Sequence, residues 1–174
     1  MVYTIPTPLS TRIKDINFLP AIRVVEKSGD KNEDAYIILK DMIEKRVPKD
    51  VLEEIFGKEY EKYIEKIIEY SSGYIRDILR VLRGVILIRD FPINEESFDL
   101  ELRTIENEFQ EFVSSNHIDF LRRVAETKEF LANDNDKEIA DKLFDLHAIL
   151  RYRNHKLWHD IHPAAKKLLE ETPQ

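Results

Sequence analysis

The chain has 174 residues, a net charge of −7 and no cysteine. The absence of cysteine excludes disulfides and thiolate metal sites, and it fits a reducing cytoplasm, where we expect the protein to be located. The acidic net charge argues against a non-specific nucleic-acid binder, but it does not exclude local basic patches on the surface. No apolar run approaches the ~18 residues of a membrane span, and residues 1–6 lack the pattern of a signal peptide.

Two short β-prone segments are expected before the helices begin. Residues 2–5 precede two prolines, and residues 21–25 run into the turn-forming sequence Ser28-Gly29-Asp30. Each segment has the composition of a short terminal or edge strand. The chain contains only four glycines, which argues against an all-β fold, and the remaining periodicity predicts a mainly α protein.

An apolar period of three to four residues predicts helices after these segments. Asn32 is the expected cap of the first helix, which extends to about residue 46. Asp50 and Glu53 form the pattern of a capping box, so the next helix is expected to begin at Asp50, with Gly57 dividing it in two. Residues 71–73 are expected to form a turn.

The next predicted helix, residues 74–90, carries three arginines on one side. Arg76, Arg80 and Arg83 recur at i, i+4 and i+7, so they share a face that could hold an anion such as a phosphate. The alternative is a solvated face or ion pairs with nearby acids. Because residues 85–88 are apolar all round, the end of this helix is expected to be buried. The apolar residues expected to back the stripe are Ile75, Ile78, Leu79, Leu82 and Ile86.

The last part of the chain is expected to combine helices with a hairpin. Residues 95–131 have a helical period with a break at 114–116, and a further helix carries apolar residues from Ile139 to Leu150. Alternation on both sides of Asn154-His155 predicts a hairpin over about 150–161, with a helix as the alternative. Trp158 is expected to anchor this hairpin, and residues 163–171 form a closing helix.

The chain resembles the C-terminal half of a bacterial AAA+-type ATPase, and three pieces carry this resemblance. Residues 2–6 resemble the strand that carries the polar first sensor. Residues 19–24, with a helix ending Glu44-Lys45-Arg46, resemble the last core strand and the passage into the lid. Ser72-Gly73-Tyr74-Ile75-Arg76 resembles the start of the lid helix with its second-sensor arginine. The tail, residues 152–163, is similar to a hairpin that follows the lid in some of these ATPases.

This resemblance implies three parts: a strand remnant of a nucleotide-binding core at 1–30, a helical lid-like domain at 31–92, and a helical, winged-helix-like module at 93–174. It also implies that Thr4, Arg46, Gly73 and Arg76 contact nucleotide, with Arg46 facing either nucleotide or a neighbouring subunit. The chain has no Gly-x-x-x-x-Gly-Lys-Ser/Thr loop. ATP or ADP is therefore expected as a cofactor only where a partner supplies the P-loop, and no ATP hydrolysis is expected from this chain alone.

A second resemblance concerns the helical HEPN ribonucleases. An arginine, a polar residue and a histidine at 153, 154 and 159 are similar to the catalytic motif of that family. The resemblance implies that Arg153, Asn154 and His159 handle the phosphate and protons of RNA cleavage. It requires a helical turn at these residues, so a hairpin there would remove the required geometry.

Three histidines near the C-terminus also suggest a metal site. His155, His159 and His162 would share a face on a helix but not on a strand, and we favour surface histidines over a metal centre. A third function remains open, a helical interaction module without an active site. The partners expected are a second protein or further copies of the chain, a P-loop subunit, and nucleic acid through the C-terminal module.

Overall fold

The structure, a computed structural model, describes residues 21–130, 137–154 and 156–171. These residues form eight helices and one two-stranded antiparallel sheet, which confirms the predicted mainly α fold. None of the helices in the described ranges has the length and apolar composition needed to cross a membrane.

The described chain divides into two compact units, which we call the helical unit (21–108) and the hairpin unit (109–171). The division falls within one long helix, whereas the sequence placed a boundary after residue 92.

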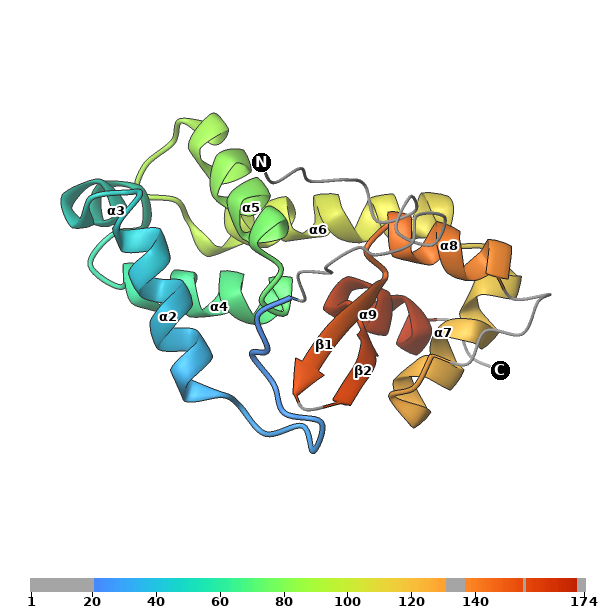
Figure 1. The fold of residues 1–174 in the computed structure, drawn as a ribbon. Helices are drawn as coiled ribbons and strands as arrows, with labels where there is room; N and C mark the ends of the chain where they lie inside the picture. Colours follow the sequence, from blue (N-terminus) through green and yellow to red (C-terminus); the bar gives the residue numbers. More distant parts are fainter. Residues whose placement is uncertain (1–20, 131–136, 155, 172–174) are drawn as a thin grey trace, which may run out of the picture. The chain divides into compact units, whose positions relative to one another are not determined.

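The helical unit consists of helices, labelled in Figure 1, and the buried residues of the unit are mostly apolar. Leu39, Ile64 and Val81, from three different helices, are completely buried. Burial of such side chains is the main source of stability for helices of this length. The helices are α2 (Glu33–Glu44), α3 (Lys49–Phe56), α4 (Tyr60–Ser71), α5 (Ile75–Ile88) and α6 (Glu95–Phe112), the last of which continues into the hairpin unit.

The ends of the first helices confirm two predictions and correct one. Asn32 caps α2, since its side-chain oxygen accepts a hydrogen bond from the Ala35 N–H at 3.2 Å. Gly57 ends α3 with a φ of 77°. The capping box at Asp50 is wrong, because α3 begins one residue earlier, after Pro48, and its cap position makes no side-chain hydrogen bond. Asp50 instead lies in the first turn, where its charge interacts favourably with the helix dipole.

The strand predicted at residues 21–25 is not formed. Only Val25 pairs, in one isolated bridge with Lys31, because a tight turn at Gly29 folds the chain back at once. The other predicted strand, residues 2–5, lies outside the described residues.

The hairpin unit has the helix–helix–hairpin order expected from the sequence (Figure 1). In the predicted break between α6 and α7, Ser114 and His117 form a capping box, with the Ser114 N–H donating to His117 Nδ1 at 2.9 Å. The helix predicted to reach Leu150 ends earlier, because His147 adopts a left-handed φ of 57°. The elements are α7 (Ser115–Thr127), α8 (Lys137–Asp145), β1 (Ile149–Asn154), β2 (Lys156–Ile161) and α9 (Pro163–Glu171).

The predicted hairpin is confirmed. In its antiparallel register Arg151 is opposite His159 and Tyr152 is opposite Trp158. The rings of Tyr152 and Trp158 stack with 4.6 Å between their centroids, and both side chains are buried. Trp158 is therefore a packing anchor, as the sequence predicted.

Candidate functional site

The turn between α4 and α5 holds the start of α5 in a fixed place. After Ser71, Ser72 is left-handed and Gly73 has a φ of 77°. The Ile22 N–H donates to the Gly73 carbonyl at 3.2 Å, and a Cβ on Gly73 would lie only 1.8 Å from the Ile22 carbonyl oxygen. Only glycine fits both this dihedral angle and this close approach.

Arg76 is exposed in the first turn of α5, immediately after this turn. The cap residue Tyr74 makes no side-chain hydrogen bond to the helix amides. Burial and the nearby Asp77 carboxylate raise the pKa of the Tyr74 hydroxyl, and the neighbouring Arg76 guanidinium opposes this shift. A guanidinium beside amides without a side-chain cap, at the positive end of a helix dipole, favours binding of an anion, whereas the buried Asp77 carboxylate in the same turn opposes it.

The other two arginines of the predicted stripe have different environments. Arg80 is half-buried and forms an ion pair with Glu108, whose hydrogen bond raises the pKa of the guanidinium further. Arg83 is exposed, and it forms no ion pair with any described residue. Arg80 thus fits the ion-pair alternative, whereas Arg76 and Arg83 remain accessible.

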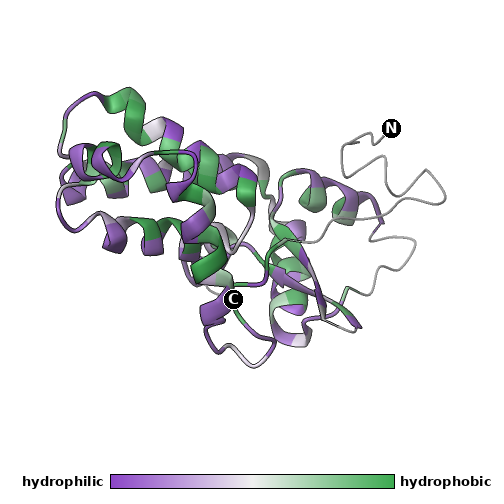
Figure 2. Cartoon of the chain, turned by 60° about the vertical axis from the view of Figure 1, so that its left-hand side comes forward, coloured by the Kyte–Doolittle hydropathy of each residue, from purple (hydrophilic) through white to green (hydrophobic). Residues whose placement is uncertain are grey.

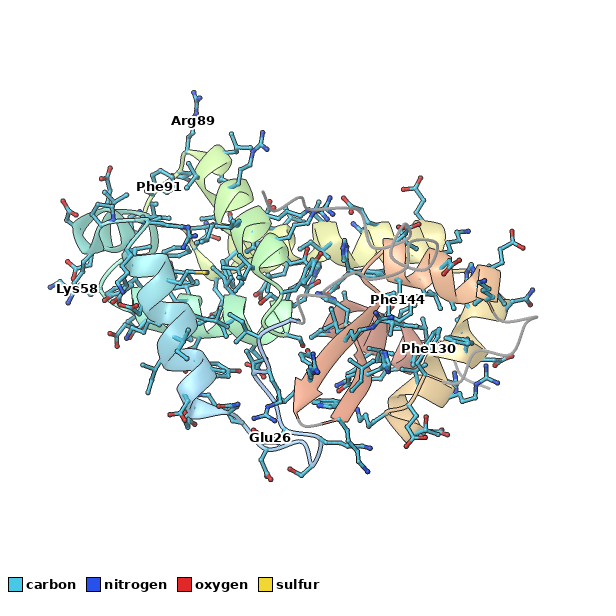
Figure 3. All side chains as sticks on the ribbon, in the orientation of Figure 1. Glu26, Lys58, Arg89, Phe91, Phe130 and Phe144 are labelled. Carbon is cyan, nitrogen blue, oxygen red and sulfur yellow. The ribbon has the colours of Figure 1, made fainter. Side chains whose placement is uncertain are left out.

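The predicted burial around the end of α5 is wrong. Of residues 85–88 only Val85 is buried, and of the residues expected to back the stripe, Leu79 and Ile86 are exposed. The reason is that α5 packs on one side only, so the apolar residues of its other side reach solvent. Figure 2 shows the apolar C-terminal turn of α5 in green, and Arg89, just after it, points away from the helices in Figure 3.

Of the four residues predicted to contact nucleotide, two lie in one turn. Gly73 and Arg76 belong to the same anchored turn. Arg46 is exposed just after α2, where its Nη1 donates to the Met42 carbonyl at 3.2 Å. Thr4 lies outside the described residues.

The residues of the ribonuclease motif lie on a hairpin. Arg153 is exposed on β1, Asn154 ends that strand, and His159 is buried on β2. The helical turn that this alternative requires is therefore absent. Residue 155 lies outside the description, and no group of His, Cys, Asp or Glu in the described ranges could hold a metal ion.

His159 and His162 are buried, so the prediction of surface histidines is wrong for both. The His159 ring lies 5.4 Å from the Phe130 ring and 5.9 Å from the Phe144 ring; both phenylalanines are labelled beside the hairpin in Figure 3. Burial, with a smaller effect of Arg151, lowers the pKa of His159 to about 4. His162 stacks on Phe109, and its Nδ1 accepts the Ala164 N–H at 3.1 Å, at the start of α9.

Asp160 is a buried residue that the sequence analysis missed. Its carboxylate accepts from Lys128 Nζ at 2.7 Å and from the Ile161 N–H at 2.8 Å, and it lies 3.5 Å from Lys166 Nζ. The network joins β2 to the end of α7 and to α9, which makes it a structural ion pair. Sequence spacing gives no signal for it, because Lys128 is 32 residues away.

Comparisons with protein-family models, with curated proteins and with solved structures found no match to this chain.

Proposed function

We propose that this chain is a lid and C-terminal region of a AAA+-like ATPase, which contacts a nucleotide held by a P-loop elsewhere and binds a partner protein. The observation that carries the proposal is the anchored turn before α5, with Arg76 exposed directly after it. The chain supplies no P-loop, so ATP or ADP would be bound jointly with the subunit or segment that has one.

The geometry of the turn suits a phosphate sensor. A phosphate near the start of α5 would meet the Arg76 guanidinium and the first amides of the helix together. The Gly73 carbonyl accepts a hydrogen bond from the Ile22 N–H. Because of this bond, the turn and the segment around Ile22 that leads into the helical unit would move together. Contact between Arg76 and a phosphate would thus be coupled to the position of that segment.

The hairpin unit is the proposed site for a partner. Leu157 is a large exposed apolar residue near the hairpin turn; it is opposite the exposed Arg153 in the strand register and follows the exposed Lys156 in the chain. An apolar residue with cations beside it suits the acidic surface of a partner protein. Nucleic acid, which is also negatively charged, is the alternative partner. The ribonuclease function is not favoured, because its motif lies on strands.

The first test is to measure the native mass of the protein together with any partner that remains bound during purification. This measurement shows whether a P-loop subunit or segment accompanies the chain. In the assembled ATPase, Arg76→Ala should weaken binding of a fluorescent ATP analogue about tenfold, corresponding to loss of one charge-assisted contact. The matched control is Arg103→Ala, which removes an exposed arginine from α6. Equal affinities of the two variants, or a protein with no P-loop partner or segment, would contradict the proposal.

A further inference from the structure

One side of α5 presents an accessible apolar surface with a central positive charge. We define the α5 face by Leu79, Arg83, Ile86 and Leu87, which recur at i, i+4, i+7 and i+8 and so lie on one side of the helix. All four are exposed, Leu87 with 61% of its surface. A contiguous face of this kind on a packed unit is typical of a protein–protein contact.

One side of α2 has the same construction with the opposite charge. We define the α2 face by Asp34, Ile37, Ile38 and Asp41, at i, i+3, i+4 and i+7. Ile37 and Ile38 are 66% and 58% exposed, and both aspartates are exposed as well. The two faces are therefore complementary. Each carries apolar side chains, and the charged residues are an arginine on the α5 face and aspartates on the α2 face.

The spacing on the two faces also agrees. On α5 the apolar pair Ile86 and Leu87 follows Arg83 by three and four residues, and on α2 the pair Ile38 and Ile37 precedes Asp41 by three and four residues. In an antiparallel arrangement, Arg83 opposite Asp41 would place the apolar pairs opposite each other, about 5 Å further along the axes. The charge pair and the apolar contact can thus form together.

We propose that the chain associates with a second copy of itself through these two faces, the α5 face of one copy on the α2 face of the next. Both faces point to solvent within the same packed unit, so they meet only between copies. Such a contact is heterologous, so each copy uses both faces, and the product is a ring if the rotation closes and an open filament if it does not.

The existing contact of Asp41 does not oppose this arrangement. Asp41 already accepts from Lys45 on its own helix at 2.6 Å. That pair is exposed, so it contributes little to stability, and a carboxylate has acceptor sites for both cations. The Arg83 guanidinium would be added to the pair without displacing Lys45.

The experiment is sedimentation velocity of the full chain over a wide range of concentration, at low and high salt. We expect the mass to rise above the 20.7 kDa of the monomer with concentration, less strongly in high salt. Arg83→Glu and Asp41→Arg should each weaken association about tenfold or more, because like charges then face each other. The double variant should restore it, and an equimolar mixture of the two single variants should associate.

Matched controls separate this contact from general charge effects. Arg103→Glu on α6 and Glu54→Arg on α3 change the net charge equally at exposed positions outside the two faces, and they should associate like the unaltered chain. Leu87→Ser should weaken association without affecting the core. A monomer at every concentration, a double variant that stays monomeric, or equal effects of the controls would overturn the proposal, provided that circular dichroism shows all variants folded.

Discussion

Acid should destabilise the hairpin unit through one histidine, His159. In the folded protein burial lowers the pKa of its ring to about 4, whereas the unfolded chain has the ordinary value of 6.5. The Nε2 atom is buried without a hydrogen-bond partner in the described structure, and the whole residue is 6% exposed. The unfolded state thus binds the proton more tightly, so the stabilisation is present above pH 6.5 and is lost as pH falls toward 4.

The size of the effect follows from these two pKa values. At about pH 5 the unfolded ring is mostly protonated and the folded ring mostly neutral, which costs about 2 kcal/mol of unfolding free energy relative to neutral pH. Toward pH 4 the cost approaches about 3 kcal/mol. His117 acts in the same direction, because burial lowers its pKa too and its Nδ1 must stay unprotonated to accept the Ser114 N–H.

The assay is urea unfolding followed by tryptophan fluorescence at neutral and at acidic pH. Trp158 is the only tryptophan and lies in the hairpin, so its signal reports this unit specifically. His159→Phe keeps an aromatic ring against Phe130 and Phe144 and removes the unpaired nitrogen, so its stability at neutral pH should be unchanged or higher. At about pH 5 the variant should lose about 2 kcal/mol less than the unaltered chain.

A variant with the same pH dependence as the unaltered protein would refute this reasoning, because it would show that the folded state accommodates the charged ring. Should phenylalanine overpack the site, His159→Met provides the same comparison with a more adaptable side chain.

Three further variants test the structure elsewhere. Gly73→Ala should cost about 2 kcal/mol or more, because the positive φ and the Ile22 carbonyl both exclude a Cβ, and a melting temperature equal to that of the unaltered chain would contradict the described turn. Asp160→Ala should cost about 3 kcal/mol by leaving the Lys128 ammonium without its buried partner, measured by urea unfolding, with Asp119→Ala on the surface of α7 as the control. Trp158→Ala should cost about 3–4 kcal/mol, measured by far-UV circular dichroism, and a cost below 1 kcal/mol would show that the stack with Tyr152 is not a packing anchor.

The sequence predicted those elements whose signals are local. The cap at Asn32, the break before α7 and the helix Pro163–Glu171 each depend on residues a few positions apart, and all are confirmed. The strand predicted at residues 21–25 failed because strand formation depends on a partner strand, and β-propensity alone does not supply one. A turn at Gly29 left room for a single bridge.

Burial was harder to predict than secondary structure. The end of α5 has the composition of a core helix, but which of its sides is covered depends on the packing of other helices. The histidines of the hairpin were assigned to the surface because a wing-like hairpin was expected there, and such a hairpin has an exposed face. In β2 the four residues from Trp158 to Ile161 are all buried, so both faces of this strand end are covered and the alternation rule does not apply.

The candidate site was predictable in part for the same reasons. Gly73 and Arg76 were selected by a short motif, and one local turn connects them. The role of Ile22 in holding that turn required a contact across 51 residues of sequence, which no spacing rule reveals. The ion pair of Asp160 with Lys128 was missed for the same reason, because 32 residues separate the two in the sequence.

The two proposals for α5 are separable on the helix itself. Arg76 and Arg83 lie seven residues apart, or about 10 Å along the axis, a distance at which effects of substitutions usually add. Arg76→Ala should therefore weaken nucleotide binding by the same factor in the unaltered chain and in the Arg83→Glu background, measured in the assembled ATPase. A smaller factor in that background would mean that self-association positions Arg76, so that docking of a second copy and contact with the nucleotide are one coupled event.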